Sequence, residues 1–507
     1  MGQKTILRKE HCVVMDNKNV TILDEKEQFQ LEQDKVLETI LEARYFAPWK
    51  NREPLAPNDV PPGNLEIFIT SSCNQHCEYC YLVKHPQLYP SEFNKHDLIM
   101  KNMTILFDWA IENNYHIPTL DIFTGEIWHS NWGLEVLDLI YDYIANKGLW
   151  VDGIMIPSNC SFIHDKKQTI EIQNRINKFK KIGIYFRFSI SIDGKVIEDQ
   201  TRPLKDGHVF IKDDKFYDDV FLFAKYNDFG FHPMVSSVSS DKWIENFEWW
   251  KKMLRKYDLP MDYLMMLEVR NDDWTDQTVE DYRKFVKYLV DDAITFHNGD
   301  IESVCNDLFS VHQTYNLEPA QQLWGPETSY TPFCFGDEKG LYGCTISSHL
   351  TVRLGDLAIA PCHRTAYNKQ LYGHFKVEND KIVGIKANNP HLAIHILMTD
   401  RNYSTIGCDT CTFQNLCIGT CKGQSVEATG DPIHNDPKVC AFLKQKYANM
   451  FDIYEEVGIM PWLEENITEY HSGFGPIKAV IDVYHRYKKE KNDAKLDLYR
   501  QNFYWKD

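Results

Sequence analysis

The sequence predicts an α/β protein, in which an open (β/α)6 barrel is followed by a cysteine-rich domain. Short apolar runs alternate with longer segments of helical periodicity between about residues 64 and 269, as expected for strand and helix units around a parallel sheet. Eight of the fourteen cysteines lie between Cys334 and Cys440. The 507 residues suffice for two or three domains, each with its own core. The expected units are an N-terminal extension at 1–60, the barrel at 61–310, the cysteine-rich domain at 311–450 and a helical tail at 451–507.

Six strands are expected in the barrel region from its apolar runs. They cover residues 65–70, 119–123, 151–157, 185–192, 233–238 and 263–269. Helical periodicity also predicts helices at about residues 28–44 and 279–296, the first of them within the N-terminal extension. Because parallel sheets place ligands at the carboxyl ends of their strands, the functional residues are expected just after these runs.

Composition indicates which partners are disfavoured for the protein and in which cellular compartment it is expected. The formal net charge of −18 disfavours nucleic acid as a partner, because proteins that bind a phosphate backbone usually carry a basic surface. The chain has no apolar run of about 18 residues and opens with no secretory signal peptide, so neither a membrane span nor secretion is expected. In the reducing cytoplasm expected for this chain, cysteines serve as metal ligands or buried thiols rather than as disulfides.

A first group of cysteines, Cys73, Cys77 and Cys80, follows directly after the first expected strand in a CxxxCxxC arrangement. Three thiolates at this spacing can hold three irons of a [4Fe–4S] cluster and leave the fourth iron open to a ligand. The alternatives are a structural zinc site with His76 as the fourth ligand, or a set of small buried hydrophobic side chains.

With Tyr79 just before the third cysteine, this loop resembles the motif of the radical S-adenosylmethionine (SAM) superfamily. The resemblance implies that SAM binds the open iron and is cleaved to a 5′-deoxyadenosyl radical, a strong abstractor of hydrogen atoms. Gly125 and Glu126, after the second strand, are similar to a Gly-Gly-Glu motif that contacts the amino group of SAM. Thr124 stands in place of the first glycine of that motif. The alternative for Glu126 is an exposed carboxylate at a strand end.

The fourth expected strand leads into Ser191 and Asp193, and Arg202 lies eleven residues after Ser191. This stretch is similar to one in anaerobic sulfatase-maturing enzymes. The resemblance implies that Ser191 binds the ribose of SAM and that Arg202 binds its carboxylate, for which a guanidinium offers a rigid fork of donors. Asp193 is a further candidate contact or a turn-capping residue. Asn159, after the third strand, either faces the same crevice or forms a turn.

The second group of cysteines resembles a SPASM domain, a C-terminal extension of peptide-modifying radical SAM enzymes. Eight cysteines can ligate two [4Fe–4S] clusters completely. The resemblance implies one auxiliary cluster on Cys334, Cys344, Cys362 and Cys421, and a second on Cys408, Cys411, Cys417 and Cys440. Gly355 lies further from Cys344 than in the usual SPASM pattern, so the hairpin between Cys344 and Cys362 is expected to be longer or differently registered.

His363 follows Cys362 at the position where sulfatase-maturing enzymes carry an aspartate base. This departure disfavours sulfatase maturation. His363 is either a base near neutral pH or a surface histidine with its hydrogen bonds satisfied. Three cysteines outside both groups, Cys12, Cys160 and Cys305, are expected to be ordinary partly buried thiols.

Three functions remain open from the sequence. The first is a maturase that modifies a peptide or protein by crosslink, thioether or oxidation, as in ribosomally made peptides, with three [4Fe–4S] clusters, SAM and a reductant such as flavodoxin or ferredoxin. The second is a SPASM dehydrogenase or epimerase of a small molecule such as a sugar or aminocyclitol. The third is a structural metal-binding module. Residues 1–60 are a candidate peptide-binding element, which favours the first function.

Overall fold

The fold is described from a computed structural model. It describes residues 4–8, 11–16, 19–42, 64–129, 132–205, 212–269, 272–309, 349–398, 411–413, 421–432, 434–466 and 477–492.

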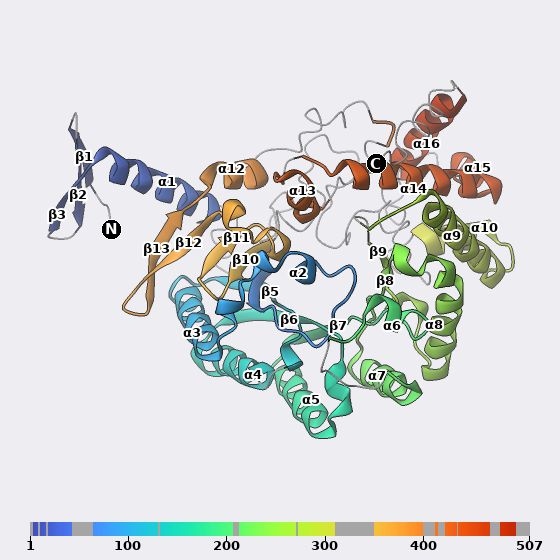
Figure 1. Cartoon of the computed structure of the whole chain (residues 1–507), viewed down its shortest axis with the longest axis horizontal. Coiled ribbons are helices and arrows are strands. Elements are labelled where there is room, and N and C mark those ends of the chain that lie inside the picture. The colour runs from blue at the N-terminus through green and yellow to red at the C-terminus, as the bar shows by residue number, and fades with distance from the viewer. Residues whose placement is uncertain are drawn as a thin grey trace.

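The chain forms a mixed α/β structure around an eight-stranded sheet, ordered β13-β12-β11-β10-β4-β5-β6-β7. Four parallel strands carry the first half of the barrel region: β4 (Asn64–Thr70), β5 (His116–Thr124), β6 (Trp150–Ser158) and β7 (Tyr185–Ile190). They confirm the first four strands expected from the apolar runs. Helices α3 (His96–Glu112), α4 (Trp132–Asp142) and α5 (Lys166–Lys181) lie along their outer side (Figure 1).

The two later strands are much shorter than the sequence predicts. β8 (Met234–Val235) and β9 (Leu267–Glu268) form a separate parallel pair, and single bridges at Phe231 connect them to β7. Pro233 has no N–H for a ladder, and the Ser236 side chain accepts a hydrogen bond from Val238 N, which starts a 3-10 helix where the strand was expected to continue. Helices α7 (Asp214–Asn227), α8 (Trp243–Tyr257) and α9 (Asp276–Phe296) accompany this half.

The C-terminal region extends the same sheet. Strand β10 (His349–Arg353) pairs in parallel with β4, and β11 (Ala358–Ala360), β12 (Gly373–Glu378) and β13 (Lys381–Ala387) follow as antiparallel neighbours. The buried Arg353 holds this junction together, because its guanidinium donates to Leu88 O, to Ala366 O and to both carboxylate oxygens of Asp356. The hairpin that carries Cys362 is therefore attached directly to the first barrel strand.

The expected N-terminal helix is present as α1 (Glu25–Leu41), which follows an antiparallel sheet of β1 (Lys4–Arg8), β2 (His11–Asp16) and β3 (Asn19–Leu23). Helix α1 lies along the edge strand β13 (Figure 1). Asp34 accepts a hydrogen bond from Ala387 N at 2.7 Å and Glu38 accepts one from Ile385 N at 2.9 Å. Carboxylates of α1 thus satisfy backbone donors that an edge strand would otherwise expose.

Helix α14 (Pro437–Glu456) connects the cysteine-rich region to the separate β8–β9 pair and the segment that follows it. Phe442 stacks on Trp274 with ring centroids 4.2 Å apart, and Lys446 forms a buried ion pair with Glu268 of β9. Short helices α12 (Pro390–Met398), α13 (Lys422–Thr429) and α15 (Ile459–Asn466), and the longer α16 (Ile477–Asn492), complete this region. Among the described helices, none combines the length and the apolar character that a bilayer crossing requires.

Candidate cluster and cofactor site

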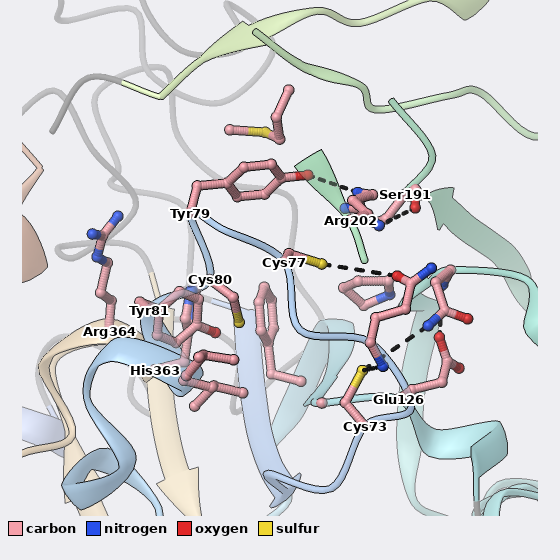
Figure 2. A pocket seen from close by; sticks show the side chains of 18 of the residues that line it. Cys73, Cys77, Tyr79, Cys80, Tyr81, Glu126, Ser191, Arg202, His363 and Arg364 are labelled. Carbon is pink, nitrogen blue, oxygen red and sulfur yellow. Dashed lines mark hydrogen bonds between the residues drawn. The ribbon is translucent and has the colours of Figure 1, made fainter. Parts of the chain in front are cut away.

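A cavity of about 900 Å³ lies at the carboxyl ends of the parallel strands β4 to β7, where the sequence predicts the functional residues. Cys73, Cys77 and Cys80 line this cavity from the loop after β4 (Figure 2). Residues of the C-terminal region, among them His363 and Arg364, line the same cavity. Residues far apart in the sequence therefore share one cavity.

The cysteine loop is held in shape by the segment that carries Arg202. The amide of His76 donates to Pro203 O at 2.8 Å, the amide of Glu78 to Thr201 O at 3.0 Å, and the amide of Lys205 to Asn74 O at 3.1 Å. These three backbone hydrogen bonds fix the loop before any cofactor binds.

Burial makes two thiols of this loop, those of Cys73 and Cys77, poor acids. Burial, and next the charge of Glu126, raises the pKa of Cys73 to about 12. Burial also raises the pKa of Cys77 far above its usual range, although Arg202 acts in the opposite direction. Both thiols need a nearby cation to ionise, which iron would provide. None of the described cysteines is in a disulfide, and no three metal-binding side chains among the described residues converge on a single-ion site.

Gly125 sits where only glycine fits. A Cβ at this position would lie 2.3 Å from Ser72 O, which is a fixed backbone atom. The close approach lets Gly125 N donate to Thr70 O at 2.7 Å and Glu126 N donate to Ser72 O at 2.8 Å. The backbone of this motif is thus fastened beneath the start of the cysteine loop.

Glu126 is 1% exposed, so it is not the exposed strand-end carboxylate that the sequence left open. Its carboxylate accepts hydrogen bonds from Asn159 N at 2.6 Å, from Trp128 N at 3.3 Å and from the Ser158 hydroxyl. None of the described cations forms an ion pair with it. Burial raises its pKa to about 7, and the hydrogen bonds only partly oppose this. A cationic group in the cavity would stabilise its charged form.

Asp193 and Arg202 form a buried network with Tyr79. The Tyr79 hydroxyl donates to Asp193 Oδ2 at 2.8 Å and accepts from Arg202 Nε at 2.6 Å. Asp193 also accepts from the Thr201 hydroxyl at 2.6 Å, and Arg202 donates to Ser191 O. Tyr79, Ser191 and Arg202 line the cavity, whereas the side chain of Asp193 is fully buried behind them. Asp193 therefore positions its neighbours from outside the cavity wall.

Asn159 fulfils both roles that the sequence left open. It lines the cavity, and its side-chain amide donates to Asn74 Oδ1 at 2.8 Å. Its Oδ1 also accepts from Ser161 N at 2.9 Å, as in a turn. Cys160 and Cys305 are buried thiols, as expected, and Cys12 lies in β2, whose side chains are outside the described part.

Cys362 and Cys421, from the second cysteine group, line the same cavity as the first group. Cys411 and Cys440 are also described and partly exposed. The remaining four of the eight cysteines lie outside the described residues: Cys334, Cys344, Cys408 and Cys417. The division of the eight thiols between two clusters stays a prediction.

His363 is held by a carboxylate that the sequence analysis did not identify. Its Nδ1 lies 2.8 Å from Glu66 Oε2, and its backbone N donates to Glu66 Oε1 at 2.8 Å. The imidazole stacks on Phe123 with ring centroids 3.8 Å apart. Burial alone would raise the pKa of Glu66, but His363, His349 and Thr351 together lower it. The signal for Glu66 was a carboxylate within an otherwise apolar strand.

His232 is a second cavity residue that the sequence analysis missed. Burial lowers its pKa to about 4, so the imidazole is neutral at physiological pH. It follows the bridge at Phe231, just ahead of the expected fifth strand at 233–238. A lone histidine near an irregular strand carries no sequence signal.

No family model and no curated protein sequence matches this chain. The structural neighbours are anaerobic sulfatase-maturing enzymes (anSME) with AdoMet, radical SAM/SPASM enzymes. Native anSMEcpe with bound AdoMet is 17% identical, with 78% of this chain and 99% of that chain covered and a TM-score of 0.49. Native anSMEcpe with bound AdoMet and Cp18Cys peptide shows the same identity and coverage and a TM-score of 0.48.

Proposed function

We propose that this chain is a radical SAM enzyme that modifies a peptide or protein substrate, as in the maturation of ribosomally made peptides. The observation that supports this proposal most directly is the shared cavity. Three motif thiols open into it beside Glu126, a buried carboxylate that has no cationic partner among the described residues. An amino acid cofactor with a cationic amino group is the kind of ligand that such a site accommodates.

The residues fit these cofactors in their chemistry. Cys73, Cys77 and Cys80 would hold a [4Fe–4S] cluster with one open iron, and Glu126 would accept a hydrogen bond from the amino group of SAM. With both bound, the site would supply a 5′-deoxyadenosyl radical that abstracts a hydrogen atom from the substrate. Ser191 lines the same cavity and is proposed to bind the ribose.

Two auxiliary [4Fe–4S] clusters are proposed for the eight C-terminal cysteines, in the division that the resemblance implies. Cys362 and Cys421, assigned to the same cluster, both border the cavity, which supports a role in electron transfer with the substrate. Electrons would enter from a reductant such as flavodoxin or ferredoxin.

His363 is the proposed proton acceptor. Because Nδ1 donates to Glu66, Nε2 carries the lone pair, and among the described residues it has no hydrogen-bond partner. A substrate that loses a hydrogen atom and then an electron must also lose a proton, and Nε2 is placed to take it. His363→Gln is expected to form 5′-deoxyadenosine but less modified product. The same ratio of product to 5′-deoxyadenosine in the variant and the wild type would exclude this role.

Iron and sulfide content, with electron paramagnetic resonance on protein purified without oxygen, tests the proposed clusters. About twelve irons are expected in the wild type and about eight in a variant with Cys73, Cys77 and Cys80 replaced by alanine. SAM cleavage is expected only in the wild type. Zinc in place of iron, or equal iron content in the wild type and the variant, would contradict the proposed SAM-cleaving cluster. Such a result would favour the structural metal-binding module instead.

Peptide binding separates the proposed substrate class from a small molecule. A short peptide encoded beside the gene is expected to bind the full chain with micromolar affinity. Removing residues 1–60 is expected to weaken this binding, because this segment includes the small β1–β3 sheet and helix α1 ahead of β4. The absence of any peptide binding would favour a sugar or aminocyclitol substrate.

A further inference from the structure

Most charged side chains that line the cavity are already paired. Arg364 donates through Nε and one terminal nitrogen to the two carboxylate oxygens of Glu427, at 2.9 and 2.8 Å. Glu268 forms an ion pair with Lys446, and both side chains are 1% exposed. His363 is paired with its glutamate, as described above. Because these charges are balanced by partners within the protein, they would contribute little to binding a charged ligand.

Arg202 is compensated within the protein as well. Its Nε donates to the Tyr79 hydroxyl and lies 3.2 Å from Asp193 Oδ1, and a terminal nitrogen donates to Ser191 O. Its side chain is 8% exposed. The guanidinium therefore works chiefly as a scaffold that joins the cysteine loop to the end of β7. Lys422, which also lines the cavity, is likewise engaged in contacts.

Among the described residues, the carboxylate of Glu126 and the ammonium of Lys205 line the cavity without an ion-pair partner. Lys205 lines the cavity and is only partly buried. No residue of the described part forms a hydrogen bond or an ion pair with its Nζ. A cavity lined by one carboxylate and one ammonium that lack ion-pair partners is complementary in charge to a zwitterionic ligand.

The backbone of Lys205 is fixed at the cysteine loop. Its amide donates to Asn74 O at 3.1 Å, and the preceding residue, Leu204, forms an antiparallel bridge with Gln75. Lys205 and Cys73 line the same cavity, and Asn74, whose carbonyl holds the Lys205 amide, directly follows Cys73 in the loop. Lys205 is thus held beside the proposed cluster and not in open solvent.

We propose that Lys205 binds the carboxylate of the amino acid group of SAM, the role that the family resemblance gives to Arg202. This inference rests on the proposed function. Glu126 and Lys205 would then receive the amino group and the carboxylate of one ligand, and Arg202 would keep the walls of the site in place.

Binding of two ligands to the iron-loaded protein tests this assignment. SAM and decarboxylated SAM, which keeps the amino group and the sulfonium, are titrated into the wild type, Lys205→Met, Lys205→Arg and the control Lys195→Met. Lys195 carries the same charge but pairs with Asp214 on the surface. The measured quantity is the ratio of the two dissociation constants, which isolates the contribution of the carboxylate.

The ratio is expected to fall about tenfold in Lys205→Met, because one charge-assisted contact to the carboxylate is lost. Binding of the carboxylate to the open iron is unchanged, so part of the preference for SAM remains. Lys205→Arg and Lys195→Met are expected to keep most or all of the preference. A Lys205→Met protein with the wild-type iron content and the wild-type ratio would overturn the inference, whereas a wild type that binds neither ligand would overturn the proposed function itself.

Discussion

Tyr79 and Asp193, which lie 114 residues apart in the sequence, are joined by a hydrogen bond of 2.8 Å from the phenol to the carboxylate. Tyr79 belongs to the cysteine loop, and Asp193 follows the fourth barrel strand. Arg202 donates to the same phenol, so the hydroxyl is donor and acceptor at once. This contact ties the proposed cluster loop to the far side of the cavity.

Tyr79→Phe is expected to lower the free energy of unfolding by about 1–2 kcal/mol, because Arg202 and Asp193 each lose one partly buried hydrogen bond. Urea denaturation under anaerobic conditions measures the change. Tyr226→Phe is the matched control, since Tyr226 is 69% exposed and should tolerate loss of its hydroxyl. Equal stability of the two variants would contradict a structural role for the Tyr79 hydroxyl.

Gly125→Ala is expected to displace the start of the cysteine loop, because its Cβ would lie 2.3 Å from Ser72 O. The iron content of the variant should then fall from about twelve toward about eight per chain, as the first cluster is lost. Gly153→Ala provides the control, since a Cβ there would meet its nearest atom, Tyr185 O, at an ordinary 3.4 Å. A Gly125→Ala protein with full iron content would show that the loop can adjust.

Glu126 predicts a pH dependence of SAM binding. Its pKa is raised to about 7 by burial, so a cationic ligand must shift it toward the ionised form. Affinity is expected to rise as pH increases through 7, and to fall again above about 8, where an α-amino group loses its proton. Titrations of SAM from pH 5.5 to 9 measure both limbs. Glu126→Gln should bind SAM more weakly, and its affinity should no longer rise as pH increases through 7, while the fall above about 8 remains. If the rise through pH 7 persists in this variant, it belongs to a group other than Glu126.

The strands β4 to β7 were predictable because each is a short, mainly apolar run, as is typical of a buried parallel strand. The pairing of β10 with β4 was not, since Thr351 and Glu66 are 285 residues apart and local sequence does not specify a distant neighbour. For the same reason, the sequence did not reveal that Glu66 is the partner of His363. Gly125 and Glu126 were found through their motif, but the steric reason for the glycine appears only when Ser72 is placed against it.

The buried ion pair between Glu268 and Lys446 predicts a large difference between single and double substitutions. Each side chain is 1% exposed, so replacing one alone removes this ion pair from a charge that stays buried. Lys446→Met is expected to cost about 3–5 kcal/mol, whereas Glu268→Gln with Lys446→Met should cost much less. A double-mutant cycle by urea unfolding measures the coupling. Additive effects would show that the two residues stabilise the junction of α14 and β9 independently.

Glu66 predicts a loss of stability in acid. Its pKa is lowered in the folded protein, mainly by His363, against a burial effect that would raise it. A carboxyl group with a lowered pKa stabilises the fold above its ordinary value of 4.5, and this contribution disappears as pH falls through the folded value.

Glu66→Gln is therefore expected to reduce the free energy of unfolding at pH 7 by about 1–3 kcal/mol, since charged hydrogen bonds to His363 become neutral ones. The difference from the wild type should shrink at pH 4, where the wild-type carboxylate begins to lose its advantage. Glu378→Gln, at an exposed position of β12, should leave the unfolding curve unchanged at both values. A Glu66→Gln difference that is equally large at pH 7 and pH 4 would mean that packing, and not charge, holds His363 in place.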